Sequence, residues 1–395
     1  MTQGVTFRAF MERALYGPQG YYTTRRPHLG RRGDFFTNAH VSPLYGELWA
    51  SFALSQVAPV AGRLVVVELG CGDGDFASAF LPPFVAGARA VGADVLYAGI
   101  DVSAEARRRA EVVLERIALD AAASAVKAAS GANACVPDAG GARGVTETRF
   151  DYLTAPDVAT ALRLNPGLRG AWVFGNEVLD ALPCDIIRVS ARETLQLFVA
   201  PAPVPPGDIL GPFRGEGQET VFRPADGPCR AYAARYLRPL AGNRDAHVIA
   251  EAHTQLGAFV DGLLAVLEPQ AVAFVDYGGF TPDVVAPDRP HGTLRAYCDH
   301  MVSDVVLDAS LDGRCDLTYD VDFTVLTDAL TERGYDVGPV QRQGAFLTAL
   351  PGFARVVEAH MSSRPNPSLA VRQLVLPGAM GDRFLVCCAQ RRVPA

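Results

Sequence analysis

Two apolar runs that each end near an acidic residue stand out in the pattern of hydrophobic and polar positions. Residues 64–69 lead directly into a glycine-rich segment, 70–74, and residues 95–100 end at Asp101. A short, unbroken apolar run is typical of a strand buried on both faces of a parallel sheet. Glycines directly after such a strand predict a tight turn into a helix, where the backbone can approach a ligand closely.

Strands and helices alternate along most of the chain. Apolar residues at helical spacing predict an N-terminal helix over residues 7–15, stopped by Gly17 and Pro18, and a second helix over 43–56. Further strands are predicted at 146–150, 171–174, 247–251, 271–275 and 384–388, and helices from residue 76 and over 104–117. This order predicts an α/β fold with a doubly wound, mostly parallel sheet, whose site lies at the carboxyl ends of the strands.

The spacing of the glycines favours one ligand over others. The dinucleotide fingerprint G-x-G-x-x-G would need its third glycine one residue later than Gly74, whereas E-x-G-x-G-x-G suits S-adenosylmethionine (SAM). We therefore expect Gly70, Gly72 and Gly74 to line the methionine part of SAM, with Glu68 in the same site. Asp101 can accept hydrogen bonds from both ribose hydroxyls. An ordinary α/β turn without a ligand is the alternative.

Several acidic residues close predicted strands and should gather at one rim of the sheet. These residues are Glu68, Asp101, Asp151, Glu177, Glu251 and Asp276. Asp151 and Tyr152 are assigned to the adenine end of SAM. For Asp151 and Glu251 the alternative is a simple cap on the next helix.

The segment 176–183, NEVLDALP, supplies candidates for the reacting site. Asn176, Glu177 and Asp180 should project together from a corner between a strand and a helix, Asn176 toward the cofactor. Methyl transfer from a sulfonium is an in-line displacement that needs a positioned nucleophile with a lone pair. Two carboxylates can hold a guanidinium by bidentate hydrogen bonds and bias its electrons toward one nitrogen. Glu177 and Asp180 are the predicted catalytic pair, and helix capping is the alternative.

Composition and net charge limit the classes of ligand and partner that the protein can be expected to bind. The chain has 395 residues, 49% of them hydrophobic, and carries a net charge of −7 with a pI near 5.6. This acidic balance argues against a nucleic-acid partner and suits a cationic substrate. Seven histidines form no close-spaced ligand set, so no metal is expected.

Cysteine usage and the N-terminal segment bear on localisation. The eight cysteines include no CxxC pair, which predicts buried free thiols in a reducing compartment. The first residues lack a charged region followed by an apolar core, and no apolar run has the length of a membrane span. The expectation is a cytoplasmic protein without a membrane partner.

Motifs along nearly the whole chain resemble one known family. They are GPQGYY at 17–22, GDFFT at 33–37, GE at 46–47, ELGCGDG at 68–74, NEVLDALP at 176–183, DYG at 276–278, GTLRAY at 292–297, DLT at 316–318, VDF at 321–323 and MGDRF at 380–384. Together they resemble the MidA-like SAM-dependent methyltransferases, the family that includes an arginine methyltransferase of mitochondrial complex I assembly.

The resemblance implies a class I SAM-methyltransferase fold with a Rossmann-like core, an N-terminal helical cover and an inserted smaller subdomain. The expected regions are a cover at 1–60, a SAM-binding core at 61–200, a Pro-rich insertion at 201–245, and the rest of the core at 246–395, which includes a substrate-side insertion at about 278–323. It also implies chemistry on an arginine guanidinium. The candidate partners are a small guanidine or an arginine-containing protein, and a second copy of the chain in a homodimer. Asp34, His40, Tyr277, Arg295 and Asp320 are expected in the acceptor pocket.

Two of these pocket residues depart from the family pattern. His40 stands where the family usually has an acid, and Asp320 stands where it usually has a histidine. Either His40 and Asp320 form one ion pair in which the acid and the base have exchanged positions, or they rebuild the pocket. In a rebuilt pocket the base binds the α-carboxylate of a substrate and the acid binds its α-ammonium group. The second interpretation favours free arginine.

The sequence thus predicts a SAM-dependent N-methyltransferase acting on a guanidino nitrogen, with free L-arginine or a small guanidine preferred over arginine in a protein. One alternative is a methyltransferase for another small hydroxyl or amine, in which a general base matters more than paired acids. The other is a non-catalytic assembly factor that binds a protein partner.

Overall fold

The computed structural model describes residues 4–24, 37–132, 148–201, 218–241, 247–286, 288–298, 301–303, 307, 313–363 and 367–392. None of the helices in these ranges combines the length and the apolar character of a membrane span.

The main sheet carries the Rossmann-like core. Its strand order is β15-β17-β10-β5-β2-β3-β4, with β14 beside β10 and β16 beside β17. The strands are β2 (Arg63–Leu69), β3 (Asp94–Ile100), β4 (Phe150–Ala155), β5 (Trp172–Asn176), β10 (Ala271–Gly279), β14 (Val321–Asp322), β15 (Tyr335–Val337), β16 (Gln341–Arg342) and β17 (Phe384–Arg391). The strands from β4 to β10 are parallel, and β17 is antiparallel to β10. The structure therefore has the mostly parallel sheet that the alternation of strands and helices predicts, in agreement with the fold that the resemblance implies.

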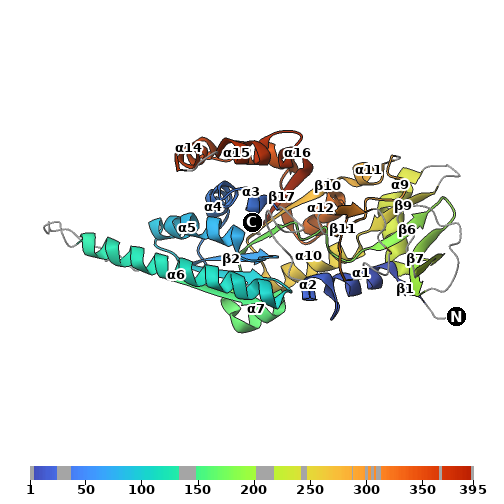
Figure 1. The fold of residues 1–395 in the computed structure, drawn as a ribbon, viewed down its shortest axis with the longest axis horizontal. Helices are drawn as coiled ribbons and strands as arrows, with labels where there is room; N and C mark the ends of the chain where they lie inside the picture. Colours follow the sequence, from blue (N-terminus) through green and yellow to red (C-terminus); the bar gives the residue numbers. More distant parts are fainter. Residues whose placement is uncertain are drawn as a thin grey trace.

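Helices cover both faces of this sheet because its strands alternate their side chains between two cores. Along β2, Val65 and Val67 belong to one core, and Leu64 and Val66 to the other. The first core is closed by α7 (Val158–Leu164), α10 (Thr254–Leu267) and α12 (Phe323–Glu332). The second is closed by α4 (Leu44–Gln56), α5 (Asp75–Ala90), α6 (Ala104–Ala132), α13 (Gln343–Ala349), α14 (Phe353–Ser363) and α15 (Pro367–Val375). Figure 1 shows α14, α15 and α16 (Met380–Arg383) lying over α3 (Asn38–Val41) and α4.

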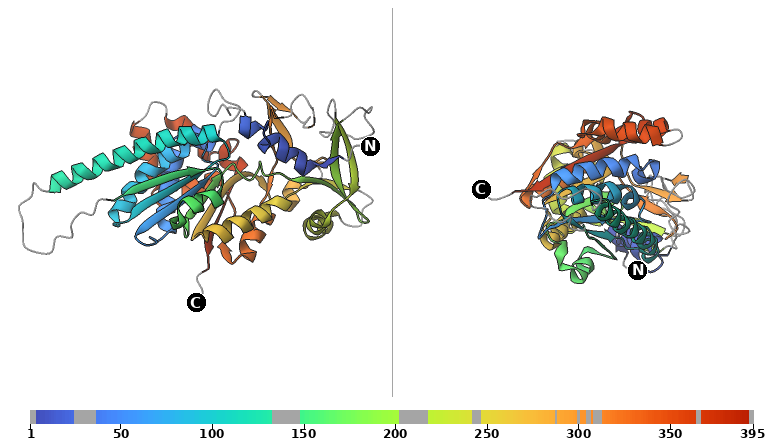
Figure 2. Two further views of the ribbon diagram at one scale, coloured as in Figure 1. Left: turned by 90° about the horizontal axis from the view of Figure 1, so that it is seen from below. Right: turned by 90° about the vertical axis from the view of Figure 1, so that its left-hand side faces the viewer.

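A second, antiparallel sheet lies at the far end of the long axis (Figures 1 and 2). Its order is β1-β7-β6-β9, with β8 beside β7. It contains β1 (Val5–Thr6), β6 (Asp185–Val189), β7 (Thr194–Pro201), β8 (Gln218–Pro224) and β9 (Val248–Ala252), and α8 (Gly227–Tyr232), the π-helix η2 (Ala233–Leu237) and α9 (Arg238–Ala241) follow β8. The sheet therefore includes strands on both sides of the predicted insertion at 201–245.

The remaining elements lie outside these two sheets. They are α1 (Phe7–Tyr16), α2 (Tyr21–Thr24), the 3-10 helix η1 (Pro166–Leu168), α11 (Thr281–Val284), and a small sheet of β11 (Arg295–Cys298), β12 (Met301–Ser303) and β13 (Asp316–Thr318). The apolar side of α1 is buried as its spacing predicts, since Phe7, Phe10, Met11, Ala14 and Leu15 all lie in the core. This helix and α4 confirm the predicted elements at 7–15 and 43–56.

Two predicted strands were misplaced. The strand expected at 146–150 runs from Phe150 to Ala155. The strand expected at 247–251 lies in the second sheet, so Glu251 is not at the rim of the main sheet; it accepts backbone hydrogen bonds from Thr293 and Leu294 at 2.7 and 2.8 Å.

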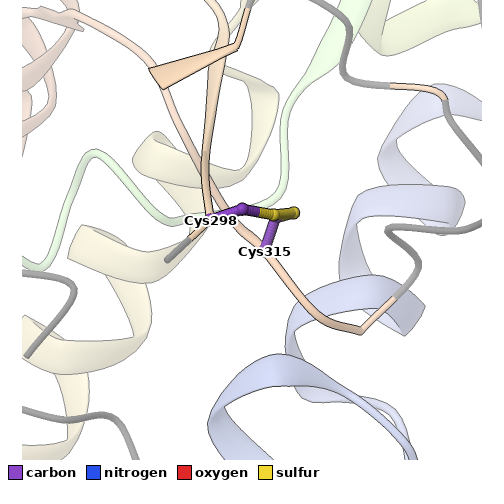
Figure 3. Close-up of a disulfide and its surroundings, with 2 residues drawn as sticks. All are labelled: Cys298 and Cys315. Carbon is purple, nitrogen blue, oxygen red and sulfur yellow. A yellow bond between two sulfur atoms is a disulfide. The ribbon is translucent and has the colours of Figure 1, made fainter. Parts of the chain in front are cut away.

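A disulfide joins Cys298 at the end of β11 to Cys315 just before β13 (Figure 3). The expectation that the cysteines are free thiols is therefore wrong for this pair. It holds for Cys71, Cys184, Cys229, Cys387 and Cys388, whereas Cys135 lies outside the described residues. Because Arg295 and Tyr297 on β11 and Asp316 on β13 line the cavity described below, the disulfide links two parts of its wall.

Candidate active site

A cavity of about 1640 Å³ opens at the carboxyl ends of β2, β3, β4, β5 and β10. Single small-ligand pockets measure roughly 300 to 1,000 Å³, so the cavity has room for a cofactor together with an acceptor group. The glycine turn and Asp101 line one part of it. Asp180, Tyr277, Arg295 and Asp320 line another.

Gly70 and Gly72 of the glycine turn line the cavity as expected, whereas Gly74 does not and faces α6 instead. Gly70, Gly72 and Gly74 have φ values of 66°, 50° and 84°, a left-handed conformation that residues with a Cβ seldom adopt. A Cβ on Gly70 would lie 2.8 Å from Cγ2 of Val178, which is closer than side chains approach each other. The turn therefore needs glycine both for its conformation and for its packing.

Asp101 is held at the end of β3 by backbone donors. Its Oδ2 accepts a hydrogen bond from the Gly72 amide at 3.0 Å, and its Oδ1 accepts one from the Ser103 amide at 2.8 Å. Burial raises the pKa of Asp101, and the two amides oppose this effect. Each carboxylate oxygen keeps a lone pair, so the group can still accept bonds from two ribose hydroxyls.

Glu68 lies deeper in the same wall and is only 4% exposed. It accepts a hydrogen bond from the Tyr97 hydroxyl, and burial raises its pKa to about 8. The open glycine backbone, the fixed Asp101 and the cavity volume together fit a SAM molecule.

Asp151 and Tyr152 do not line the cavity. Because β4 begins at Phe150, Asp151 lies near its amino end, where it forms ion pairs with Arg149 at 2.6 Å and Arg63 at 3.4 Å. The carboxyl end of β4 instead brings the segment 156–159 to the cavity, including Asp157, which caps α7. The assignment of Asp151 and Tyr152 to adenine rested on the wrong strand boundary.

Glu177 occupies a strained position directly after β5. Its φ is 55°, and its backbone amide donates to the Val275 carbonyl at 2.9 Å, which fixes the corner against β10. Oε1 of Glu177 accepts hydrogen bonds from the Asn38 amide at 3.1 Å and from Nδ2 of Asn176 at 2.9 Å. Burial raises the pKa of Glu177 to about 7, while the Asn38 amide lowers it.

Asp180 is the most enclosed acid of the predicted pair, with a relative exposure of 5%. Its Oδ2 accepts a hydrogen bond from the Tyr277 hydroxyl, and within the described part of the chain its Oδ1 has no partner. Burial raises its pKa to about 6. The buried Asp276 accepts bonds from the amides of Leu179 and Asp180 at 3.0 and 3.3 Å and so fixes this turn.

His40 and Asp320 do not form the ion pair considered from the sequence. Nε2 of His40 lies 2.8 Å from Oδ2 of Asp75 at the start of α5. Asp320 instead pairs with both Arg289 and Arg295. Because two guanidinium groups already neutralise Asp320, the expectation that it receives a substrate α-ammonium is not supported.

The wall contains residues that the sequence reasoning did not single out. Tyr16 and Tyr22 stack with ring centroids 5.5 Å apart, and the Tyr22 hydroxyl donates to Asp316 at 2.9 Å. Both tyrosines line the cavity, as do residues 378–380 and 382–384 near the C-terminus. Arg295 lies over the Tyr277 ring at 5.0 Å, and Asp34 lies outside the described residues. The GPQGYY and MGDRF motifs were the available signals for these walls.

Comparison with known proteins agrees with this geometry. Residues 48–339, well over half of the chain, match the family described as "Putative S-adenosyl-L-methionine-dependent methyltransferase". A protein from Burkholderia thailandensis solved with S-adenosyl-homocysteine bound is 26% identical, with a TM-score of 0.72 over 100% of this chain and 89% of that one. A native crystal structure from the same organism gives a TM-score of 0.68 at the same identity.

Curated relatives extend over nearly the whole chain. The mitochondrial protein arginine methyltransferase NDUFAF7 of rat is 25% identical over 97% of this chain and 80% of its own length. Its fruit-fly homologue is 26% identical over 95% of this chain and 79% of its own length. Because these relatives are mitochondrial proteins, they contradict the cytoplasmic localisation expected from the sequence.

The glycine turn, the fixed Asp101 and the cavity therefore agree with the family match. SAM is the cofactor of this protein, and the chain belongs to the family of SAM-dependent methyltransferases.

Proposed function

We propose that this methyltransferase transfers the methyl group of SAM to a guanidino nitrogen of an arginine side chain in a protein. The observation that carries the proposal is the pair Glu177 and Asp180, two carboxylates from one corner that line the same cavity as the glycine turn. The relatives of rat and fruit fly, which are protein arginine methyltransferases, support the same acceptor class.

The two acids differ in how they can hold a guanidinium. Oδ1 of Asp180 is buried and has no partner among the residues that the structure describes, so it can accept a charge-assisted hydrogen bond from one guanidinium nitrogen. Glu177 uses Oε1 for the bonds from Asn38 and Asn176, which leaves Oε2 for a second nitrogen. Two carboxylates bound to one guanidinium localise its positive charge on the two nitrogens that they contact. The third nitrogen then has more lone-pair character and can attack the sulfonium methyl group.

Transfer also releases a proton, because a guanidinium that gains a methyl group must lose one N–H hydrogen to keep a single positive charge. Glu177, whose pKa is about 7, is suited to accept that proton near neutral pH. The methyl–sulfur bond breaks as the methyl–nitrogen bond forms, and the sulfur keeps the bonding electron pair. Turnover should therefore increase as the pH rises through about 7.

The acceptor is proposed as protein arginine because the case for a free amino acid depended on His40 and Asp320. His40 pairs with Asp75, and Asp320 pairs with two arginines, so neither is reserved for the charged ends of a small substrate.

The experiment supplies the purified protein with methyl-labelled SAM and four acceptors in parallel: free arginine, agmatine, N-acetyl-L-arginine amide and a protein extract. Acid hydrolysis and mass spectrometry then identify the labelled amino acid. We expect labelled methylarginine from the protein extract, with less or none from free arginine. Label on a hydroxyl or on a non-guanidino amine would overturn the proposal.

A further inference from the structure

The strongest feature outside the acid pair is a buried chain of amides that reaches Glu177 from the C-terminal part of the molecule. Asn38 on α3 and Gln343 on α13 are both fully buried, with relative exposures of 0%. Nε2 of Gln343 donates to Oδ1 of Asn38 at 2.8 Å and to the Leu374 carbonyl at 3.3 Å. Both acceptors lie on the Nε2 side of Gln343, which fixes the orientation of its carboxamide, whereas its buried Oε1 has no partner among the described residues.

The hydrogen bond from Gln343 fixes the orientation of the side-chain carboxamide of Asn38. A carboxamide has one acceptor end and one donor end, and Gln343 occupies the acceptor end of Asn38. The donor, Nδ2, therefore faces Oδ1 of Asn176 at 3.3 Å and Oε1 of Glu177 at 3.5 Å. The Tyr45 hydroxyl donates to the same Asn176 oxygen at 2.7 Å, which turns Nδ2 of Asn176 toward Glu177 as well.

All these donors converge on one carboxylate oxygen. Oε1 of Glu177 accepts hydrogen bonds from the backbone amide of Asn38, from Nδ2 of Asn38 and from Nδ2 of Asn176. Oε2 accepts no hydrogen bond from the described residues. The arrangement therefore orients Glu177 and distinguishes its two oxygens. It leaves one of them to the cavity.

We infer that Asn38 and Gln343 are positioning residues, which hold the Glu177 carboxylate ionised and keep its second oxygen available to the acceptor. This inference rests on the proposed role of Glu177 in acceptor binding. It places a determinant of that role on α13, a helix that contributes none of the residues lining the cavity.

Other charged groups near Glu177 act on the same ionisation. Asp180 raises the pKa of Glu177 and His40 lowers it, while the buried Asp276 and Tyr45 also interact with its charge. Alanine in place of Asn38 or Gln343 leaves these groups and the backbone amide of Asn38 in the sequence, so a change in the titration of Glu177 can be assigned to the lost side-chain carboxamide.

The test follows the titration of Glu177 by infrared spectroscopy, using the carboxylate band that disappears in the Glu177→Gln variant. We expect Asn38→Ala and Gln343→Ala to move the midpoint of the Glu177 titration to higher pH by about one unit. The first substitution removes the Nδ2 donor and the second releases it from its fixed orientation, and a charge-assisted hydrogen bond favours the ionised form. The matched control is Gln196→Ala, which removes another buried glutamine that donates to a carboxylate, Asp185 at 2.8 Å, away from the cavity.

Three outcomes separate the possibilities. A shift in both variants, with an unchanged midpoint in Gln196→Ala, supports the inference. An unchanged midpoint in Asn38→Ala and Gln343→Ala overturns it, even if the variants lose thermal stability. Methyl transfer at the native rate by Glu177→Gln would instead overturn the proposed function, because the acid pair would then be dispensable. The effect of Asn38 on the titration of Glu177 could still be measured in the native protein, so the two failures are distinguishable.

Discussion

Asp180→Asn is the substitution that most directly removes the acceptor-binding charge. The asparagine keeps the size of the side chain and can still accept from the Tyr277 hydroxyl, but it offers a neutral amide to the cavity in place of the unpartnered Oδ1. Removing one partner of a buried, hydrogen-bonded charge pair costs about 2 to 5 kcal/mol. Since about 1.4 kcal/mol corresponds to a factor of ten, kcat/KM should fall at least roughly 30-fold.

The assay compares native protein and variant with the acceptor that gives the highest turnover, and measures SAM binding separately by calorimetry. The SAM dissociation constant should change little, because Asp101 and the glycine turn are untouched. Asp328→Asn is a matched control, since it removes a more exposed carboxylate that pairs with Arg235 at 2.6 Å away from the cavity. Turnover by Asp180→Asn within about twofold of the native rate would refute the role of its charge.

Three further outcomes are expected. Gly72→Val should weaken SAM binding at least tenfold, because its φ of 50° strains a β-branched residue, and unchanged calorimetric affinity would contradict this. Burial raises the pKa of Glu68 to about 8, so the folded state keeps a proton that the unfolded chain releases above about 4.5, and stability falls as pH rises between these values. Glu68→Gln should therefore flatten the decline in Tm between pH 5 and 8, and an unaltered slope would exclude this source. Cys298→Ser opens a disulfide between residues 17 apart and should cost roughly 3 kcal/mol of stability under oxidising conditions only; equal Tm values with and without reductant in the native protein would count against the bond.

The sequence was most informative where one local pattern determines the structure. The apolar run of β2 and the glycines after it predicted the strand and the tight turn correctly, and the start of α5 to within one residue. The spacing of apolar residues in α1 also predicted which side of that helix is buried. These features depend on neighbouring residues, so a single chain carries enough information for them.

Strand ends were less predictable because several residues can close a β-strand equally well. Asp151 was taken as the last residue of its strand, but the pattern continues through Leu153 to Ala155. This shift moved Asp151 to the opposite edge of the sheet, next to Arg63. One wrong boundary therefore changed the predicted adenine site.

Contacts between distant segments could not be derived from the sequence. Tyr22 bonds to Asp316, 294 residues away, and Gln343 bonds to Asn38, 305 residues away. The partners of His40 and Asp320 were equally out of reach, because several acids and arginines of the chain could have paired with either. Only the packing of the helices against the sheet selects among them.

The central claim is that Glu177 and Asp180 hold a guanidinium beside the cofactor. A bisubstrate inhibitor, in which an adenosyl group is joined to an alkyl guanidine in place of the methionine chain, tests this without knowledge of the natural acceptor. Calorimetry should show at least tenfold weaker binding of this inhibitor to Glu177→Gln and to Asp180→Asn than to the native protein, and equal binding of S-adenosyl-homocysteine to all three. Equal affinity of the guanidine inhibitor for the native protein and both variants would contradict the account.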